Sequence, residues 1–216
     1  MILKIDINQR VFFTSDTHYA HANICSATSD WKEGDGSHLR KFNSLSEMND
    51  TLVSNINSRV GEDDILFHLG DWSFGGFENI QKFRDRLVCR NIHLILGNHD
   101  HHISRNRDGI QDIFSSVHDY LELDLRRYQN RSTVIKHKFV MMHFPIASWN
   151  EISRGRIHLH GHTHLSPKHR VSPGRSMDVG VEGNGLFPIP LEEVLKIMKG
   201  RSVANLVLPE DRHVIE

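Results

Sequence analysis

Five apolar segments of this chain are each followed at once by Asp, Asn or His. The segments are typical of β-strands, and they are RVFFTSD (10–16), DILFHLGD (64–71), NIHLILGNHD (91–100), KFVMMHFP (138–145) and RIHLHGHTH (156–164). Asp and Asn are poor strand formers, whereas Asp, Asn and His are good ligands. Open α/β sheets hold their binding sites at the carboxyl ends of strands. The repetition therefore predicts a sheet protein whose strand ends carry a functional site.

Helical patterns lie between the early strand segments. Residues 44–61 have Leu, Met and Val at helical spacing, with Ser44 as an N-cap signal and Gly61 as a stop signal. Residues 77–88 show the same helical periodicity of apolar side chains. This alternation of strands and helices favours an α/β fold over an all-β fold.

Strands predominate in the second half of the chain. Residues 117–126 and 132–143 are predicted to be successive antiparallel strands. A last helix is predicted over residues 191–200, directly after Pro190. The apolar residues 203–208 are a candidate for a closing strand.

The composition is that of one globular domain spanning residues 1–216. The formal net charge of −1 argues against a general electrostatic attraction to nucleic acid or to anionic lipid. No apolar segment has the length of a membrane span or of a signal peptide core. The two cysteines, Cys25 and Cys89, are too few for a disulfide framework. We therefore expect a cytoplasmic protein without a membrane partner.

The side chains at the strand ends suit a pair of divalent metal ions. Carboxylate and imidazole groups are ligands for Zn, Mn, Fe, Co or Ni, and thiolate is absent from these segments. One carboxylate can bridge two ions, as two-metal sites about 3.5–4 Å apart require. Gly residues before the ligands let the backbone turn sharply where a strand ends. Each pattern alone is common by chance, but five in order predict a two-metal site.

The ordered motifs D-x-H, G-D, G-N-H-D, a single His and G-H-x-H resemble those of the calcineurin-like metallophosphoesterase superfamily. The resemblance covers residues 10–178, and the stretch SDTHYAHANI (15–24) is similar in particular to small members without a cap domain from bacteria and bacteriophages. It implies an α/β fold that is a four-layer αββα sandwich, with two mixed β-sheets flanked by helices. One departure is Phe144, which follows His143 where many relatives have Gly.

The resemblance also implies a role for each motif residue. The first ion would be bound by Asp16, His18 and His164, the second by Asn98, His143 and His162, and Asp71 would bridge both. His99 would contact the phosphate and protonate the leaving group, and Asp100 would orient His99 and fix its tautomer. The cofactors implied are two divalent transition-metal ions, Mn, Fe, Zn, Ni or Co, with Mn favoured. The implied reaction is hydrolysis of a phosphate ester by a hydroxide that bridges the ions.

Two polar residues beyond His18 have two interpretations. His21 and Asn23 are either ordinary turn residues or, by the resemblance, contacts to the substrate. Histidines within the strand segments, His68, His158 and His160, are expected to be satisfied or supporting residues rather than ligands.

The remaining histidines and loop cations have a simpler interpretation. His101 and His102 follow the G-N-H-D motif and are expected to be exposed in a loop. The basic residues of the loops at 34–44 and 166–176, among them Arg40, are expected to be solvated, with contact to anionic groups of the substrate as the less favoured alternative.

Three classes of function compete. A two-metal phosphoesterase is favoured because every expected ligand position is present. A non-catalytic interaction domain on the same fold is the alternative, and a structural zinc module would instead use closed sets of four ligands, usually with Cys. The resemblance implies a phosphate ester as substrate and leaves monoester or diester open, although a phosphodiester such as a cyclic nucleotide or a nucleic-acid end fits a capless site slightly better. The sequence leaves the oligomeric state open.

Overall fold

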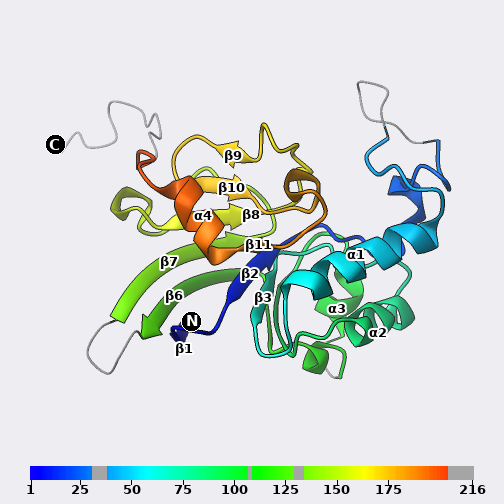
Figure 1. The fold of residues 1–216 in the computed structure, drawn as a ribbon, viewed down its shortest axis with the longest axis horizontal. Coiled ribbons are helices and arrows are strands. Elements are labelled where there is room, and N and C mark those ends of the chain that lie inside the picture. The colour runs from blue at the N-terminus through cyan, green and yellow to red at the C-terminus, as the bar shows by residue number, and fades with distance from the viewer. Residues whose placement is uncertain (31–37, 107–108, 129–133, 204–216) are drawn as a thin grey trace.

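Two β-sheets form the framework of the protein (Figure 1). The computed structural model describes residues 1–30, 38–106, 109–128 and 134–203. The six-stranded sheet consists, in order, of β1 (Ile2–Asp6), β6 (Tyr120–Tyr128), β7 (Val134–Met142), β8 (Ile157–His160), β10 (Ser176–Asp178) and β9 (Val171–Ser172). The five-stranded sheet consists of β11 (Ile189–Pro190), β2 (Val11–Thr14), β3 (Ile65–His68), β4 (Asn91–Ile95) and β5 (Ser116–His118).

Both sheets are mixed. Strands β2, β3, β4 and β5 run parallel, and β11 joins them antiparallel to β2. In the other sheet β7, β8 and β10 run parallel, while β6 and β7 form the predicted antiparallel pair. The structure thus confirms the prediction of an α/β fold with two mixed sheets and helices.

The core between the sheets is built from alternate strand residues that face inward. Phe13 lies with its ring centroid 5.7 Å from that of Phe67 in the same sheet and 5.5 Å from that of Phe139 in the other. Helix α4 (Leu191–Met198), which begins after Pro190 as predicted, contributes Leu191, Val194 and Met198 to the same buried cluster. Burial of this apolar surface is the main force that holds the two sheets together.

Three helices cover the other face of the five-stranded sheet. Helices α1 (Leu45–Arg59), α2 (Phe77–Arg86) and the short α3 (His101–Arg105) lie together on one side, away from α4 (Figure 1). Val53 and Phe83 pack in one buried cluster with Leu66 of β3. The Ser44 side chain accepts a hydrogen bond from the Glu47 amide, so the predicted N-cap is confirmed.

Two segments differ from their predicted local structure or lie partly outside the described residues. His101 and His102 begin α3 rather than lying in a loop, because the buried Ile103 anchors one helical turn against the α1–α2 side. The predicted closing strand at 203–208 lies outside the described residues except for Val203. Within the described parts of the chain, no helix combines the length and the apolar character needed to cross a membrane.

Candidate metal centre

The carboxyl ends of strands from both sheets meet at one edge of the sandwich. Ser15, after β2, forms a bridge with Gly180, which follows β10 in the other sheet. The His143 ring, after β7, lies with Nδ1 2.7 Å from the Leu69 carbonyl oxygen, after β3. The Gly161 amide, after β8, donates to the His143 carbonyl oxygen at 2.9 Å. Together with the hydrogen bond from the Asp16 amide to the Gly70 carbonyl oxygen at 2.9 Å, these contacts bring four of the five predicted ligand segments to one place, and Asn98 after β4 joins them.

The backbone at this edge is held in an uncommon conformation. Among the described residues, eight that are not glycine have a positive φ, and five of them are predicted ligands: Asp16 (57°), His18 (46°), Asp71 (56°), His162 (69°) and His164 (46°). Such conformations cost about 1–3 kcal/mol each and cluster at functional sites. The strained backbone therefore marks the same residues as the sequence motifs.

Gly70 shows why glycine precedes a ligand here. Its φ is +96°, and a Cβ atom at this position would lie only 2.6 Å from Nδ1 of His143 and from the Gly97 amide nitrogen. No side chain fits between the ends of β3 and β7. The close approach carries Asp71 next to His143, as the sequence interpretation of these glycines expected.

The first group of predicted ligands is Asp16, His18 and His164. Their ligand atoms all lie within 4.8 Å of one another. The Nε2 atoms of His18 and His164 are 3.3 Å apart, and the Asp16 oxygens accept the His162 amide at 3.0 Å. Burial raises the pKa of Asp16 to about 7, because a carboxylate without water is costly unless a cation lies beside it.

The second group is Asp71, His143 and His162, whose ligand atoms also lie within 4.8 Å of one another. The Asn98 Oδ1 atom joins this group at 3.1 Å from His143 Nε2. Asp71 lies between the two groups, with Oδ2 3.4 Å from both His18 Nε2 and His143 Nε2. The structure therefore brings all seven predicted ligands together, and Asp71 has the position expected of a bridging carboxylate.

The electrostatics of the centre favour positive charge. Although burial opposes it, the contact with Asp71 raises the pKa of His143. In the same way, Glu182 outweighs burial and raises the pKa of His164 to about 9. A raised histidine pKa means that the surrounding oxygens stabilise a cation at that ring. Either protons or metal ions could supply this positive charge, and a divalent ion supplies more of it than a proton does.

His99 lies over the junction of the two groups without belonging to either. Its side chain is 41% exposed, and its Nε2 lies 4.0 Å from Asp71 Oδ2. Its ring centroid is 5.4 Å from that of His18. The backbone amide of His99 donates to Asp71 Oδ1 at 2.9 Å, which ties the loop to the predicted bridge. An imidazole held here can reach a group bound at the centre.

The predicted role of Asp100 as the residue that orients His99 is wrong. Asp100 is buried, and its two carboxylate oxygens accept hydrogen bonds from the backbone amides of Gly97, Asp71 and Trp72 at 2.8–2.9 Å. The Asp100 carboxylate thereby links the loop after β4, where Asp100 and Gly97 lie, to the loop after β3, where Asp71 and Trp72 lie. Asp100 thus positions Asp71 rather than the His99 imidazole.

His21 and Asn23 occupy different surroundings. The His21 ring stacks on Phe74 with centroids 3.5 Å apart, and its centroid is 5.3 Å from that of His18. Burial is the main cause that lowers the pKa of His21 to about 4, so the ring is neutral. Asn23 is exposed in the helical turn η1 (Ala22–Ile24). The structure brings His21 to the centre and leaves Asn23 at its margin.

Three strand histidines are supporting residues, as expected. His68 Nε2 lies 2.8 Å from the Thr17 hydroxyl, and the hydroxyl itself bonds the Trp72 carbonyl oxygen. His158 Nδ1 contacts the Val140 carbonyl oxygen at 3.2 Å, and His160 Nδ1 contacts that of Gly161 at 3.1 Å. All three rings are buried beneath the ligand loops, which they help to hold.

The sequence interpretation missed the pair Arg40 and Glu182. Glu182, in the helical turn η4 (Glu182–Asn184), has Oε2 3.2 Å from His164 Nδ1 and Oε1 within 2.7–2.8 Å of the Arg40 guanidinium. Arg40 also donates to the carbonyl oxygens of Asp16 and Thr17, at 2.5 and 2.6 Å. Arg40 is 2% exposed, so the expectation that it is solvated is wrong. These contacts brace the first ligand group from behind.

No local pattern could have revealed this pair, because its members lie 142 residues apart in the sequence. Arg40 lies in a loop whose amino-acid composition is typical of solvent-exposed segments. A buried guanidinium is stable only when its donors are satisfied, and here a carboxylate and two carbonyl groups satisfy them. Only the folded structure brings these partners together.

Two phenylalanines border the centre. Phe74 lies beside the first group, with its ring centroid 5.8 Å from that of His18 and 4.8 Å from that of His99. Phe144 lies beside the second group, 5.0 Å from the His143 centroid and 4.7 Å from the His162 centroid. Phe144 is 37% exposed, which leaves part of its ring surface available next to the ligands.

Comparisons with known proteins reveal relatives of similar length. No protein-family model matches the sequence. An uncharacterized protein of Methanocaldococcus jannaschii is 28% identical over 208 residues, covering 92% of this chain and 97% of the relative. The gene 66 protein of Mycobacterium phage D29 is 28% identical over 204 residues, covering 87% of this chain and 95% of the relative.

A solved structure has the same fold. The crystal structure of a protein of unknown function from Aquifex aeolicus matches with a TM-score of 0.57 and 19% identity, covering 88% of this chain and 100% of that chain. At this identity the match supports the fold alone. The names of these three proteins state no activity, so the function rests on the chemistry of the site.

Proposed function

We propose that this protein is a phosphoesterase that works with two divalent transition-metal ions. The observation that carries the proposal is the arrangement of acceptors around His143. Its Nδ1 lies 2.7 Å from the Leu69 carbonyl oxygen and donates to it, so Nε2 carries a lone pair in the neutral ring. That lone pair faces Asn98 Oδ1 at 3.1 Å and Asp71 Oδ2 at 3.4 Å. Three acceptors that converge in this way require a proton or a metal ion among them, and a divalent ion can contact all three at once.

The donor set fits the proposed ions. Imidazole, carboxylate and amide oxygen suit Mn, Fe, Zn, Ni or Co, with Mn favoured by the resemblance, and the buried thiols of Cys25 and Cys89 take no part. The first ion would be held by Asp16, His18, His164 and Asp71, and the second by Asp71, Asn98, His143 and His162. When bound, such ions supply a water whose pKa is lowered toward ~7 and neutralise charge on phosphate oxygens.

The chain's own residues would contribute the remaining chemistry. The His99 side chain is partly exposed beside the ligand groups and binds no metal in this scheme, so its imidazole can give a proton to the leaving oxygen. Such general acid catalysis contributes roughly 10²–10⁴-fold. His21 and, at the margin, Asn23 are candidates for hydrogen bonds to the substrate. The buried Asp100 would hold Asp71 in place through the Asp71 amide.

The rings beside the centre favour substrates with a planar group. Phe144 offers a partly exposed face next to the second ligand group, and stacking on such a face suits a nucleobase or an aryl group. We therefore favour a phosphodiester with a planar substituent, such as a cyclic nucleotide or a nucleic-acid end, over a small aliphatic monoester.

The proposal is tested by metal reconstitution and a panel of esters. The protein is stripped with a chelator, reloaded with Mn, Zn or Ni, and assayed on nitrophenyl diesters and monoesters, cyclic nucleotides and short oligonucleotides. We expect two ions per chain and hydrolysis that depends on them, with diesters preferred. Two tightly bound ions without hydrolysis of any ester would instead favour the non-catalytic interaction domain, and failure to bind ions would refute the two-metal proposal.

A further inference from the structure

A polar cavity lies away from the candidate metal centre, at the start of β8. Its volume is about 310 Å³, and it is enclosed by β7, by the loop that leads into β8, by the turn before β10 and by α4. The charged side chains that line it are Lys136, Lys138, Glu151, Arg154, Arg156 and Arg175. Cavities of this size accommodate small organic ligands.

The cavity is separate from the metal centre because the two lie at opposite ends of β8. Ile157, the first residue of the strand, lines the cavity, whereas the predicted ligands His162 and His164 follow the last. The strand has four residues, which span roughly 13 Å at ~3.3 Å per residue. A ligand in the cavity would therefore not contact the proposed ions.

One carboxylate holds three of the cations that line the cavity. Glu151 accepts hydrogen bonds from Lys138 at 2.9 and 3.0 Å and from Arg156 Nε at 3.0 Å, and Arg154 lies 3.5 Å from it. Glu151 itself has a positive φ of 57°, and the backbone amides of Arg154 and Arg156 donate to its carbonyl oxygen. The turn is thus shaped so that Glu151 faces the cations.

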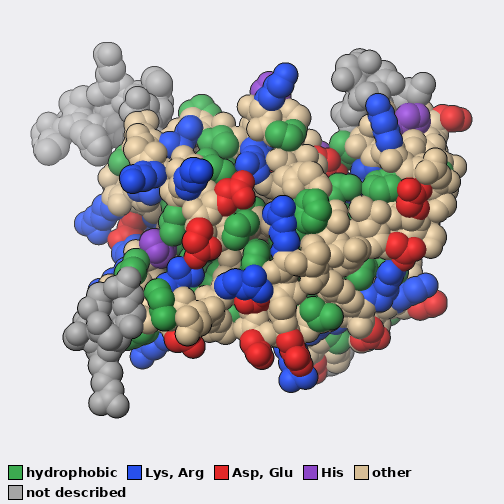
Figure 2. Space-filling view, viewed as in Figure 1, with side chains coloured by type: hydrophobic (Ala, Val, Ile, Leu, Met, Phe, Trp, Pro, Cys, Tyr) green, Lys and Arg blue, Asp and Glu red, His purple; other side chains and the backbone are tan. Residues whose placement is uncertain are grey.

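Positive charge remains in excess after these pairs are counted. Arg156 also contacts Glu122 and Asp124, at 3.4 and 3.3 Å, so five cations face three carboxylates. Lys136 and Arg175 form no ion pair with any described residue, and the Arg175 Nε atom is buried without a hydrogen-bond partner in that part of the chain. Figure 2 shows Lys and Arg side chains interspersed with Asp and Glu on the face of the molecule that carries α4.

An excess of about two positive charges in a concave site matches a dianion. Guanidinium and ammonium groups bind phosphate through short, charge-assisted hydrogen bonds, and an unpaired buried Nε–H is a donor ready for such a bond. Leu195 of α4 and Ile157 provide an apolar wall beside the cations. That wall would contact the organic part of a ligand whose phosphate lies between Lys136 and Arg175.

We propose that this cavity binds the dianionic phosphate group of a small phosphorylated organic molecule. Lys136, Arg175 and Arg154 would hold the phosphate, and Leu195 would contact the organic portion. The inference does not depend on the proposed phosphoesterase activity, because none of these residues lies among the predicted metal ligands.

The test measures binding of inorganic phosphate and of phenylphosphonate to the full chain by calorimetry, with and without chelator. Phenylphosphonate has no ester bond to hydrolyse, so it remains intact at either site. We expect saturable binding that is insensitive to chelator, tighter for phenylphosphonate than for phosphate because of the apolar wall. The Lys136→Glu substitution, at an exposed position, should weaken binding about 10-fold or more, as loss of a charged hydrogen bond predicts.

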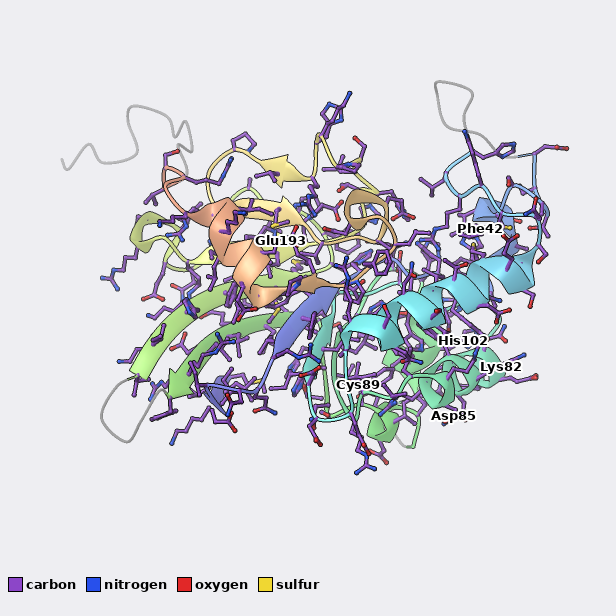
Figure 3. All side chains as sticks on the ribbon, viewed as in Figure 1. Phe42, Lys82, Asp85, Cys89, His102 and Glu193 are labelled. Atoms are coloured by element: carbon purple, nitrogen blue, oxygen red, sulfur yellow. The ribbon has the colours of Figure 1, made fainter. Side chains whose placement is uncertain are left out.

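Two further variants separate the site from general charge effects. Arg175→Gln should weaken binding to a similar extent, and Lys82→Ala should leave it unchanged, because Lys82 projects from α2 on the opposite side of the molecule (Figure 3). Melting temperatures of all three variants check that they fold. Binding that disappears with chelator, or that is equal in the wild type and in folded Lys136→Glu, would overturn the proposal.

Discussion

The two ligand groups of the candidate centre differ in what lies behind them. In the first, Asp16 and His18 are 0% and 2% exposed, and His164 rests against the buried ion pair of Glu182 and Arg40. In the second, His162 and Asn98 are exposed, and Nδ1 of His143 lies against the backbone carbonyl of Leu69 rather than against a carboxylate. A carboxylate behind a histidine ligand raises its basicity and fixes its orientation. The difference suggests a tightly held ion in the first group and an exchangeable, substrate-facing ion in the second.

The largest effect is expected at the residue that the two groups share. Asp71→Ala removes the one carboxylate placed between His18 and His143, so both groups lose a ligand at once. We expect hydrolysis to be abolished and bound metal to fall from two ions toward one or none. Metal analysis by mass spectrometry is the measurement, and Asp85→Ala, an exposed change on α2 (Figure 3), is the control. Two retained ions in Asp71→Ala would reject the bridging role.

A smaller effect is expected from His99, which lies over the junction and contributes to neither group. His99→Asn should retain both ions and slow hydrolysis by roughly 10²-fold or more, because the leaving oxygen loses its acid. The loss should be smaller for nitrophenyl esters, whose leaving groups need no proton, than for alkyl esters. His101→Asn, in the exposed first turn of α3, is the matched control. An equal loss for both kinds of ester would count against the acid role.

The sequence predicted the ligands of both groups, but it did not predict the residues that support the first group. The ligands themselves follow strand ends, and a strand end with a glycine and a polar residue is a local pattern. Support such as Glu182 and Arg40 depends on packing between distant segments, which no local pattern encodes. Asp100 illustrates the same limit: its neighbourhood in the motif suggested a partner in His99, whereas folding turned it toward three amides.

The fold class and one strand pair were predictable for a related reason. Alternation of apolar segments with helical periods favours α/β, and the antiparallel pair of β6 and β7 follows from two adjacent strands with a short connection. The cap of α1 at Ser44 is likewise a local signal. The start of α3 at His101 was missed because its one anchoring residue, Ile103, is buried by distant helices rather than by its own sequence pattern.

The Glu182→Gln substitution tests whether the two groups differ in metal affinity. This change keeps the shape of the side chain and removes the charge behind His164, so it should lower affinity for one ion by roughly 10- to 100-fold and spare the other. Competition with a metal-binding dye resolves the two affinities. Glu193→Gln is the control. Glu193 lies on α4 (Figure 3), where it pairs with Arg170, so its substitution should alter neither metal affinity.

The pH dependence of metal affinity in the same variant separates a direct effect of the Glu182 charge on His164 from damage to the fold. Glu182 holds the pKa of His164 at about 9, so protons compete with metal at this ring up to that pH. Affinity for the first ion should therefore rise with pH until about 9 in the wild type. In Glu182→Gln the pKa of His164 falls toward its ordinary value, so the rise should end at lower pH. An unchanged profile with lower affinity would mean that Glu182 acts only through the fold.

The smallest expected effect lies at the open side of the second group. Phe144 is partly exposed beside His143 and His162 but carries no polar atom, so Phe144→Leu should leave both ions and the melting temperature nearly unchanged. If the ring stacks on a planar substituent, its loss costs about 0.5–1.5 kcal/mol, or roughly 2- to 12-fold in kcat/KM. The loss should appear for aryl and nucleotide esters and be absent for methyl esters. Phe77→Leu, at another exposed phenylalanine, serves as the control for a general loss of surface rings. An equal change for methyl and aryl esters would show that Phe144 shapes the loop rather than the substrate site.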